Sequence, residues 1–191
     1  MSDHSDLKAR ARVFFALWPD AATREQLACE ARRIHVQRGG RLTRVETLHL
    51  TLVFIGDIAR ERLTELIRAA VTVRAPYFDI DFDQAGLLAP QPDCLSHASQ
   101  PPDALHELVD SLEQALAAAA FVYDQRPYKP HITLVRRGDC PTAAPAALAT
   151  PIHWSAREFV LVESRLSQDG PAYTVVERFG LVPWPLKTPQ A

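Results

Sequence analysis

A five-residue motif that occurs twice constrains the fold of this chain more than any other feature. Residues 49–53 and 131–135 both read His-x-Thr-Leu-Val, and the two copies begin 82 residues apart. Each copy lies in a short apolar run that is typical of a buried strand. Because alternate residues of a strand share a face, the His and the Thr of one copy point together, with aliphatic side chains behind them. The repeat therefore predicts two strands, related by approximate internal symmetry, that face each other across a cleft.

The other apolar runs alternate with helical patterns along the chain. We expect further strands over residues 13–18, 77–83, 94–97, 159–162 and 173–176, and the motif strands over 48–55 and 131–135. Helices are predicted after Asp20, from about Leu63 and from Asp103, and loops over 84–102 (outside the short strand) and 138–151. The last two strands have no helix between them. The pattern therefore favours an α+β fold with antiparallel or mixed sheets over a doubly wound parallel sheet.

The length and the charge of the chain limit the classes of protein to which it can belong. The chain has 191 residues, of which 47% are hydrophobic and 23% charged, which suits one domain spanning residues 1–191, built as one core or as two small lobes. The net charge of -2 excludes a strongly basic coat protein for nucleic acid but leaves room for a local basic cleft. Arginine outnumbers lysine by 18 to 3, and arginine is the better bidentate phosphate ligand, although genome composition explains the same bias more simply.

The sequence gives no sign of export or of a membrane span. Cys29, Cys94 and Cys140 are scattered and odd in number, so reduced thiols are expected rather than a disulfide framework. The apolar run at residues 13–18 is too short for a signal segment or a transmembrane helix. We expect a cytoplasmic monomer without a membrane partner, whose tails at residues 1–10 and 184–191 are frayed.

Two imidazoles and two hydroxyls that face one another suit phosphoryl chemistry. Histidine has an unperturbed pKa of about 6.5, so a neutral ring can take a proton from a nucleophile while a protonated ring gives one to a leaving oxygen. Threonine hydroxyls can donate to phosphate oxygens as charge builds there. A metal site is the competing use of two histidines, but neither motif has a carboxylate, a cysteine or a third histidine at a fitting offset. The residues alone leave open which histidine is the acid and which is the base.

The doubled motif and its flanks resemble the 2H phosphoesterase superfamily, and within it the bacterial and archaeal RNA 2′,3′-cyclic phosphodiesterases, also called 2′-5′ RNA ligases. The resemblance covers most of the chain. It rests on residues 13–20 (VFFALWPD), 48–56 around the first motif, 126–136 (RPYKPHITLVR) and 158–166 (EFVLVESRL). It implies a bilobal α+β fold with helices outside two sheets, a pseudo-two-fold axis and a central cleft.

The activity that the resemblance implies is metal-independent hydrolysis of a terminal 2′,3′-cyclic phosphate, on RNA or on a small cyclic nucleotide, to a 2′-phosphate. No cofactor is expected. By the family pattern His49 carries over as the proton donor and His131 as the proton acceptor, while Thr51, Thr133 and Arg136 carry over as phosphate ligands. Reversible 2′-5′ ligation, or hydrolysis of 2′-5′-linked oligonucleotides, is an alternative for the same cleft. An RNA- or nucleotide-binding module with little catalysis is an alternative of another class.

Further residues near the motifs are candidates for a substrate-binding rim. These are Phe14, Arg44, Arg126, Tyr128 and Lys129, whose alternative role is ordinary surface charge or, for Phe14, core packing. The chain departs from the family pattern at residues 42–47, where members often read Trp-Val-Arg-Pro-Glu-Asn, and at residues 95–96, where members often have a tryptophan. Fewer aromatic rings would weaken base stacking, which is worth about 1–3 kcal/mol per base. The sequence therefore constrains the substrate range less than the phosphate chemistry.

Overall fold

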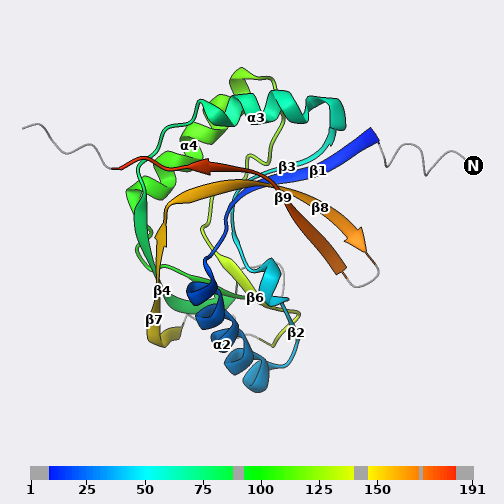
Figure 1. The fold of residues 1–191 in the computed structure, drawn as a ribbon. Helices are drawn as coiled ribbons and strands as arrows, with labels where there is room; N and C mark the ends of the chain where they lie inside the picture. Colours follow the sequence, from blue (N-terminus) through cyan, green and yellow to red (C-terminus); the bar gives the residue numbers. More distant parts are fainter. Residues whose placement is uncertain (1–8, 88–92, 140–145, 168–169, 184–191) are drawn as a thin grey trace, which may run out of the picture.

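The computed structural model of the protein describes residues 9–87, 93–139, 146–167 and 170–183. Its named strands form a nine-stranded sheet in the order β7-β4-β5-β6-β3-β1-β8-β9, with β2 paired to β6, and all of these pairs are antiparallel (Figure 1). The strands are β1 (Arg10–Leu17), β2 (Arg41–Leu42), β3 (Leu50–Ala59), β4 (Phe78–Leu87), β5 (Cys94–His97), β6 (Ile132–Arg136), β7 (Ala146–Ala156), β8 (Glu158–Ser167) and β9 (Gly170–Gly180).

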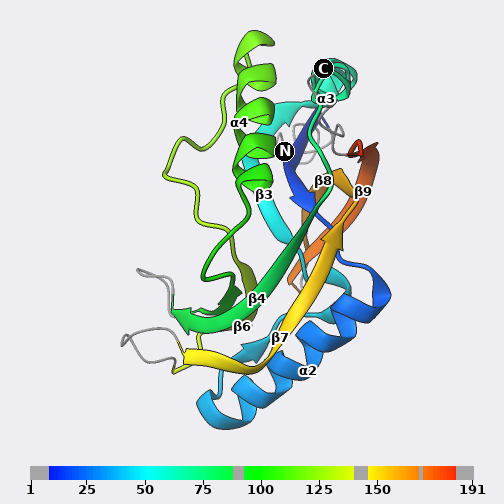
Figure 2. The ribbon, with the colours of Figure 1, turned by 90° about the vertical axis from the view of Figure 1, so that its left-hand side faces the viewer.

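The α-helices of the described residues are α2 (Ala21–Arg38), α3 (Leu63–Val71) and α4 (Asp103–Ala118). α2 begins where the Asp20 carboxylate accepts a hydrogen bond from the backbone N–H of Thr23 at 2.8 Å, and it ends at Gly39, whose φ is 63°. Figure 2 shows α2 lying along β6 and β7, while α4 packs on β3 and α3 packs on α4 and β9. No helix in this part of the chain is long and apolar enough to cross a membrane.

A single residue pair joins the two halves of the sheet. One half contains β7, β4, β5 and β6, and the other contains β3, β1, β8 and β9. The pair that connects them is Leu50 of β3 with Ile132 of β6. The expected α+β fold with antiparallel strands is confirmed, and the junction of the two halves lies within the two copies of the repeated motif.

Alternation along β1 and β8 separates the two faces of the sheet. Phe15 and Phe159 belong to the large hydrophobic core, to which all three α-helices contribute. Phe14 and Val160, their neighbours in sequence, belong to a smaller cluster on the opposite face. We call this opposite face the site face, and its cluster consists of Phe14, Ala16, Val160 and Val162.

Two segments that we expected to be loops are strands. Residues 146–151 belong to β7 and residues 84–87 to β4, and the two run side by side, with Gln84 opposite Ala147 and Ala85 opposite Ala146. The loop prediction was wrong because these stretches lack apolar alternation, and their strand conformation depends on the neighbouring strand rather than on local preference. The hairpin expected from residues 159–176 is confirmed, since β8 and β9 pair along their length.

The chain ends and the cysteines differ in part from what the sequence predicts. The frayed tails expected at residues 1–10 and 184–191 lie outside the described residues, except that Ala9 and Arg10 are described and Arg10 begins β1. Cys29 is free and exposed, whereas Cys94 at the start of β5 is disulfide-bonded, so the expectation of reduced thiols is wrong for Cys94. Cysteine spacing could not reveal this, because a disulfide depends on a close approach that only the fold sets.

Candidate active site

The two motif strands bring both histidines and both threonines to one face of the sheet. The residue pair that joins β3 to β6 is fully buried in the large core. Extending its antiparallel register by one residue in each direction sets His49 opposite Thr133 and Thr51 opposite His131. Thr51 also lies opposite Ala16 of β1, which belongs to the site face. The four side chains of the motifs therefore converge on the site face, at the junction of the two half-sheets.

Both motif strands contain a β-bulge at the same position. The extra residue is Leu52 on β3 and Leu134 on β6, which is the fourth residue of the motif in each copy. The burial pattern of the two strands is the same over five residues, and the Leu-Val dipeptide of each copy is buried in the large core. Because a bulge sets two residues against one on the partner strand, the side-chain alternation shifts by one residue beyond it. The residues that follow the motifs, Phe54 and Arg136, consequently return to the site face.

Each motif histidine is held by the same kind of hydrogen bond. Nδ1 of His49 lies 2.6 Å from the carbonyl oxygen of Thr47, and Nδ1 of His131 lies 2.7 Å from the carbonyl oxygen of Lys129. A carbonyl oxygen can only accept a hydrogen bond, so Nδ1 carries a proton in both rings. In a neutral ring Nε2 is then an unprotonated base, and in a charged ring it is a donor. Each Nε2 atom is thus able to take or to give a proton.

Three aromatic rings enclose His49. Its ring stacks on Trp18 with centroids 5.5 Å apart and an interplanar angle of 16°, and its centroid lies 5.0 Å from Phe14 and 5.2 Å from Tyr173. Phe14 is itself only 3% exposed, so it packs against the histidine rather than offering a free surface. Neither Trp18 nor Tyr173 was expected at the site from the sequence. Residues 42–47 and β5 contain no phenylalanine, tyrosine or tryptophan, but β1, the residue after it and β9 supply the rings around His49.

The enclosure of His49 changes its protonation. Burial, with smaller repulsions from Arg136 and His131, lowers the pKa of His49 to about 4, although the hydrogen bond to Thr47 acts in the opposite direction. The free protein therefore holds His49 uncharged at neutral pH. An anion bound beside the ring would raise this pKa again, because an opposite charge favours the imidazolium form.

Positive charge gathers on the Tyr173 side of the site. Burial raises the pKa of Tyr173, and the charges of Arg136, Arg44 and Arg12 act on its hydroxyl in the opposite direction. Nη1 of Arg136 also lies 3.3 Å from a carboxylate oxygen of Asp93, which orients the arginine. A guanidinium group next to two histidines is suited to hold a phosphate oxygen.

The other residues expected near the site have different roles. Arg126 is exposed and its guanidinium pairs with the carboxylate of Asp124. The hydroxyl of Tyr128 donates to the carbonyl oxygen of Thr51 at 3.3 Å, and burial raises its pKa, so this ring supports β3 and is not placed as a stacking surface. The side chain of Lys129 is exposed, and its backbone carbonyl is the one that holds the second motif histidine.

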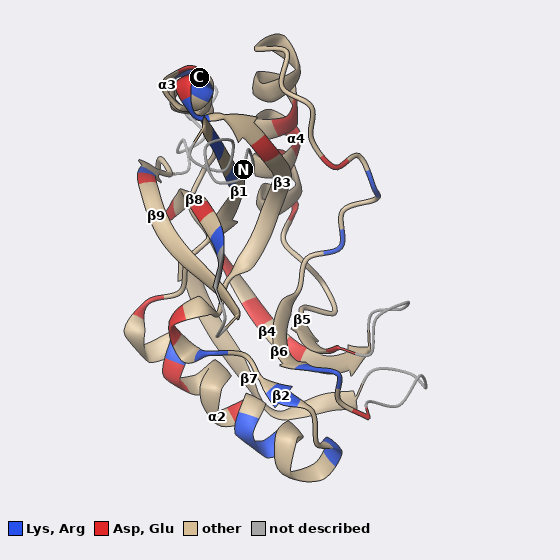
Figure 3. Cartoon of the chain, turned by 90° about the vertical axis from the view of Figure 1, so that its right-hand side faces the viewer, with Lys and Arg blue, Asp and Glu red and all other residues tan. Residues whose placement is uncertain are grey.

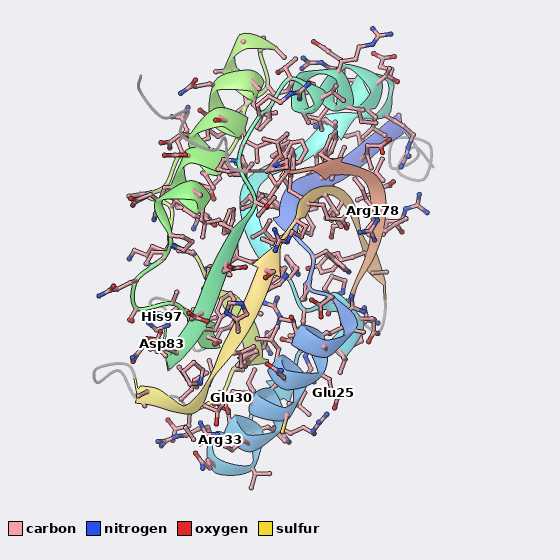
Figure 4. The ribbon with its side chains drawn as sticks, turned by 60° about the vertical axis from the view of Figure 1, so that its left-hand side comes forward. Glu25, Glu30, Arg33, Asp83, His97 and Arg178 are labelled. Carbon is pink, nitrogen blue, oxygen red and sulfur yellow. The ribbon has the colours of Figure 1, made fainter. Side chains whose placement is uncertain are left out.

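His97 is a third histidine near the motif pair, and no role was expected for it from the sequence. Extending the register between β5 and β6 sets His97 opposite His131 on the site face. Burial lowers the pKa of His97, Asp83 opposes this shift and His131 adds to it. Figure 4 shows Asp83 and His97 close together at one end of the sheet. Only strand register reveals this neighbour, because the sequence around residue 97 contains no motif.

A hollow of about 360 Å³ lies next to Trp18, where β1 leads into α2 and β7 leads into β8. Its lining includes Trp18, Arg24, Trp154 and Arg178, and Trp18 is the residue that it shares with the rings around His49. Neither motif histidine lines it, so the acid–base groups lie on the site face and not in this hollow. Within the described residues, no group of three or more His, Cys, Asp or Glu side chains is placed to hold a metal ion.

Comparison with known proteins agrees with this arrangement. The sequence pattern of the 2′-5′ RNA ligase superfamily matches residues 18–168. The chain is 31% identical over 174 residues to the RNA 2′,3′-cyclic phosphodiesterase of Escherichia coli, a match that covers 89% of this chain and 96% of that protein. It is 29% identical over 184 residues to the protein of the same name from Thermus thermophilus, covering 89% and 90% of the two chains.

A solved structure extends the likeness to three dimensions. The crystal structure of E. coli LigT complexed with 3′-AMP superposes with a TM-score of 0.81 at 28% identity, covering 90% of this chain and 98% of that chain. The open antiparallel sheet of this α+β fold, together with a family match over most of the chain, defines the class of protein. The chain belongs to the 2′-5′ RNA ligase superfamily.

Proposed function

We propose that this protein hydrolyses the 2′,3′-cyclic phosphodiester at the end of an RNA chain, or in a small cyclic nucleotide, to a 2′-phosphomonoester. The observation that carries the proposal is the pairing of Leu50 with Ile132, which sets two imidazoles and two hydroxyls on one face of the sheet. The relatives from E. coli and T. thermophilus that bear the name of this activity match nearly the whole chain, which supports the proposal.

In the proposed reaction a water oxygen attacks phosphorus, and the bond from phosphorus to the 3′-oxygen breaks. Nε2 of His131 takes a proton from the water, and Nε2 of His49 gives a proton to the departing 3′-oxygen. The bond to the 2′-oxygen is kept, so the products are a 2′-phosphate and a free 3′-hydroxyl. The hydroxyls of Thr51 and Thr133 and the guanidinium of Arg136 donate to the non-bridging oxygens, where charge builds in the transition state.

The low pKa of His49 is compatible with a donor role once the substrate is bound. Burial keeps the ring neutral in the free protein. A cyclic phosphate brings a negative charge beside the ring and raises its pKa, and the neighbouring aromatic faces attract the imidazolium that forms. The bound phosphate thus favours uptake of a proton from solvent by His49, which then acts as the acid, while His131 serves as the base.

Turnover of a nucleoside 2′,3′-cyclic phosphate, with chromatographic separation of the 2′- and 3′-phosphate products, tests this proposal. We expect the 2′-phosphate, at the same rate with and without EDTA, because side chains supply the proton transfers and the charge stabilisation. Binding without turnover would support the nucleotide-binding alternative. Product from 2′-5′-linked oligonucleotides alone would support the ligase-type reaction, and loss of turnover on chelation, restored by one divalent ion, would support a metal site.

A further inference from the structure

Two arginines face each other at the edge of the site. Arg41 of β2 lies directly opposite Arg136 of β6 in the antiparallel register. Residues directly opposite in a sheet point to the same face, so Arg41 extends the positive charge of Arg136 along the site face. Like charges at such a position destabilise the pair, so negative charge bound along this edge of the site would relieve a repulsion in the free protein.

Two arginines near Arg41 already have partners. Arg136 lies 3.3 Å from Asp93, and Arg44 lies 3.7 Å from Glu46 and also donates to a backbone carbonyl. Arg41 is exposed, and its side chain has no hydrogen bond or ion pair with any residue that the structure describes. Its guanidinium is therefore available to bind a ligand, in contrast to those of its two neighbours.

The available guanidinium of Arg41 lies at the edge of the site, on the strand next to that of Arg136. Figure 3 shows basic residues on β2, at the end of β6 and along α2, at the opposite end of the molecule from α3. A phosphate held by Arg136 and the motif residues has Arg41 as its neighbour on the adjoining strand. A substrate group that extends from this phosphate towards β2 would therefore come within reach of Arg41.

We propose that Arg41 binds the phosphodiester that connects the terminal nucleotide to the rest of an RNA strand, so that the protein prefers an RNA end to a free cyclic mononucleotide. This inference rests on the proposed function, because it takes the cyclic phosphate to lie at Arg136. A strand carries a phosphate at each nucleotide, whereas a nucleoside cyclic phosphate carries one. Contacts to phosphate carry no base information, so the preference concerns the length of the strand and not its sequence.

The test compares kcat/KM for a nucleoside 2′,3′-cyclic phosphate with kcat/KM for a tetranucleotide that ends in the same cyclic nucleoside. The wild-type protein should prefer the tetranucleotide. In Arg41→Gln the ratio of kcat/KM for the tetranucleotide to kcat/KM for the mononucleotide should fall roughly tenfold, which corresponds to one hydrogen bond between charged groups. Turnover of the mononucleotide should be unchanged. For the tetranucleotide, a plot of log(kcat/KM) against the logarithm of the salt concentration should be less steep in Arg41→Gln than in the wild type. The slope should differ by up to about 0.7, which is the value for one phosphate of a single strand.

Arg68→Gln is the matched control, because Arg68 is an exposed arginine of α3, far from β2, and this variant should behave as wild type on both substrates. An unchanged preference for the tetranucleotide in Arg41→Gln would overturn the inference and leave the proposed function intact. Equal losses on both substrates would also overturn it, since Arg41 would then act on the reacting phosphate. Absence of mononucleotide turnover in the wild-type protein would instead contradict the proposed function itself.

Discussion

The strands β3 and β6 have the same local structure but different surroundings. In each, the histidine ring is held by the carbonyl oxygen two residues earlier, and a bulge follows the threonine. Both rings are partly exposed, but His49 lies against three aromatic rings and its pKa falls to about 4, whereas His131 has no phenylalanine, tyrosine or tryptophan neighbour of this kind among the described residues. The motif therefore sets the geometry of the site, while the residues on neighbouring strands control the protonation of the histidine ring.

This asymmetry matters because two identical rings in identical surroundings could not be told apart as acid and base. In many enzymes the acid and the base are distinguished because their surroundings give two titratable groups different pKa values. Here Trp18, just after β1, and Tyr173 of β9 lie beside the first histidine, and β5 contributes His97 beside the second. Matched substitutions in β3 and β6 test whether the two strands contribute equally to catalysis.

The largest expected effect shows whether the two strands form one site. His49→Ala and His131→Ala should each lower turnover of a 2′,3′-cyclic phosphate by roughly 10²–10⁴-fold, because each removes one proton-transfer group. The double variant should lose less than the product of the two single effects, since the groups act as a unit. Steady-state kinetics on variants with native circular dichroism measures both. Near-native turnover in either single variant would mean that its strand is not part of the catalytic machinery.

The second prediction concerns pH and tests the difference in aromatic surroundings between the two histidines. Because the pKa of His49 is lowered from 6.5 to about 4 in the folded protein, the unfolded chain binds a proton in this window that the folded protein does not. Stability should therefore fall as pH falls from 6.5 towards 4, by roughly 3 kcal/mol from this ring. His49→Gln should remove that part of the loss, which urea unfolding at the two pH values measures.

The matched variant His131→Gln should keep the acid-induced loss of stability, because the buried ring of His49 is still present. If the two glutamine variants instead have the same dependence on pH, the aromatic enclosure does not control the protonation of His49. The contrast between the two strands would then be one of shape only.

A smaller effect is expected at the threonines, where the two strands should be equivalent. Thr51→Val and Thr133→Val should each lower kcat by roughly 10–100-fold, because each removes one hydroxyl hydrogen bond to a charged phosphate oxygen. Valine preserves the strand preference and leaves both histidines in place. Kinetics at saturating substrate gives the two values. A large effect in one strand with none in the other would show that the phosphate is held from one side.

The smallest effect is expected at Arg126, which precedes the second motif in sequence but is paired with Asp124 at the surface. Arg126→Gln should leave kcat/KM for the cyclic phosphate unchanged and alter stability by less than about 1 kcal/mol. Arg136→Gln, the matched change on the site face, should lower kcat/KM by roughly tenfold or more. Similar losses in both variants would indicate that the substrate also contacts the segment before β6.

The sequence by itself determined the local elements and the four motif residues. The helix that follows Asp20 and stops at Gly39 was predictable, because a capping carboxylate and a glycine act within one turn of the chain. The shared face of each histidine and its threonine was predictable too, since strand alternation acts over two residues. The doubled motif predicted two symmetry-related strands that face each other, and the order of apolar runs and helical patterns predicted the α+β class.

Only the tertiary structure decided what surrounds the motifs. The bulges at Leu52 and Leu134, which return the following residue to the site face, exist because of how the partner strands pair. Tyr173 and His97 reach the two histidines from other strands, where no local pattern marks them. The strand at 146–156 likewise depends on β4. These features arise from contacts between residues distant in sequence. The pKa of His49 depends on every group that excludes water from its ring, and the motif alone does not encode those groups.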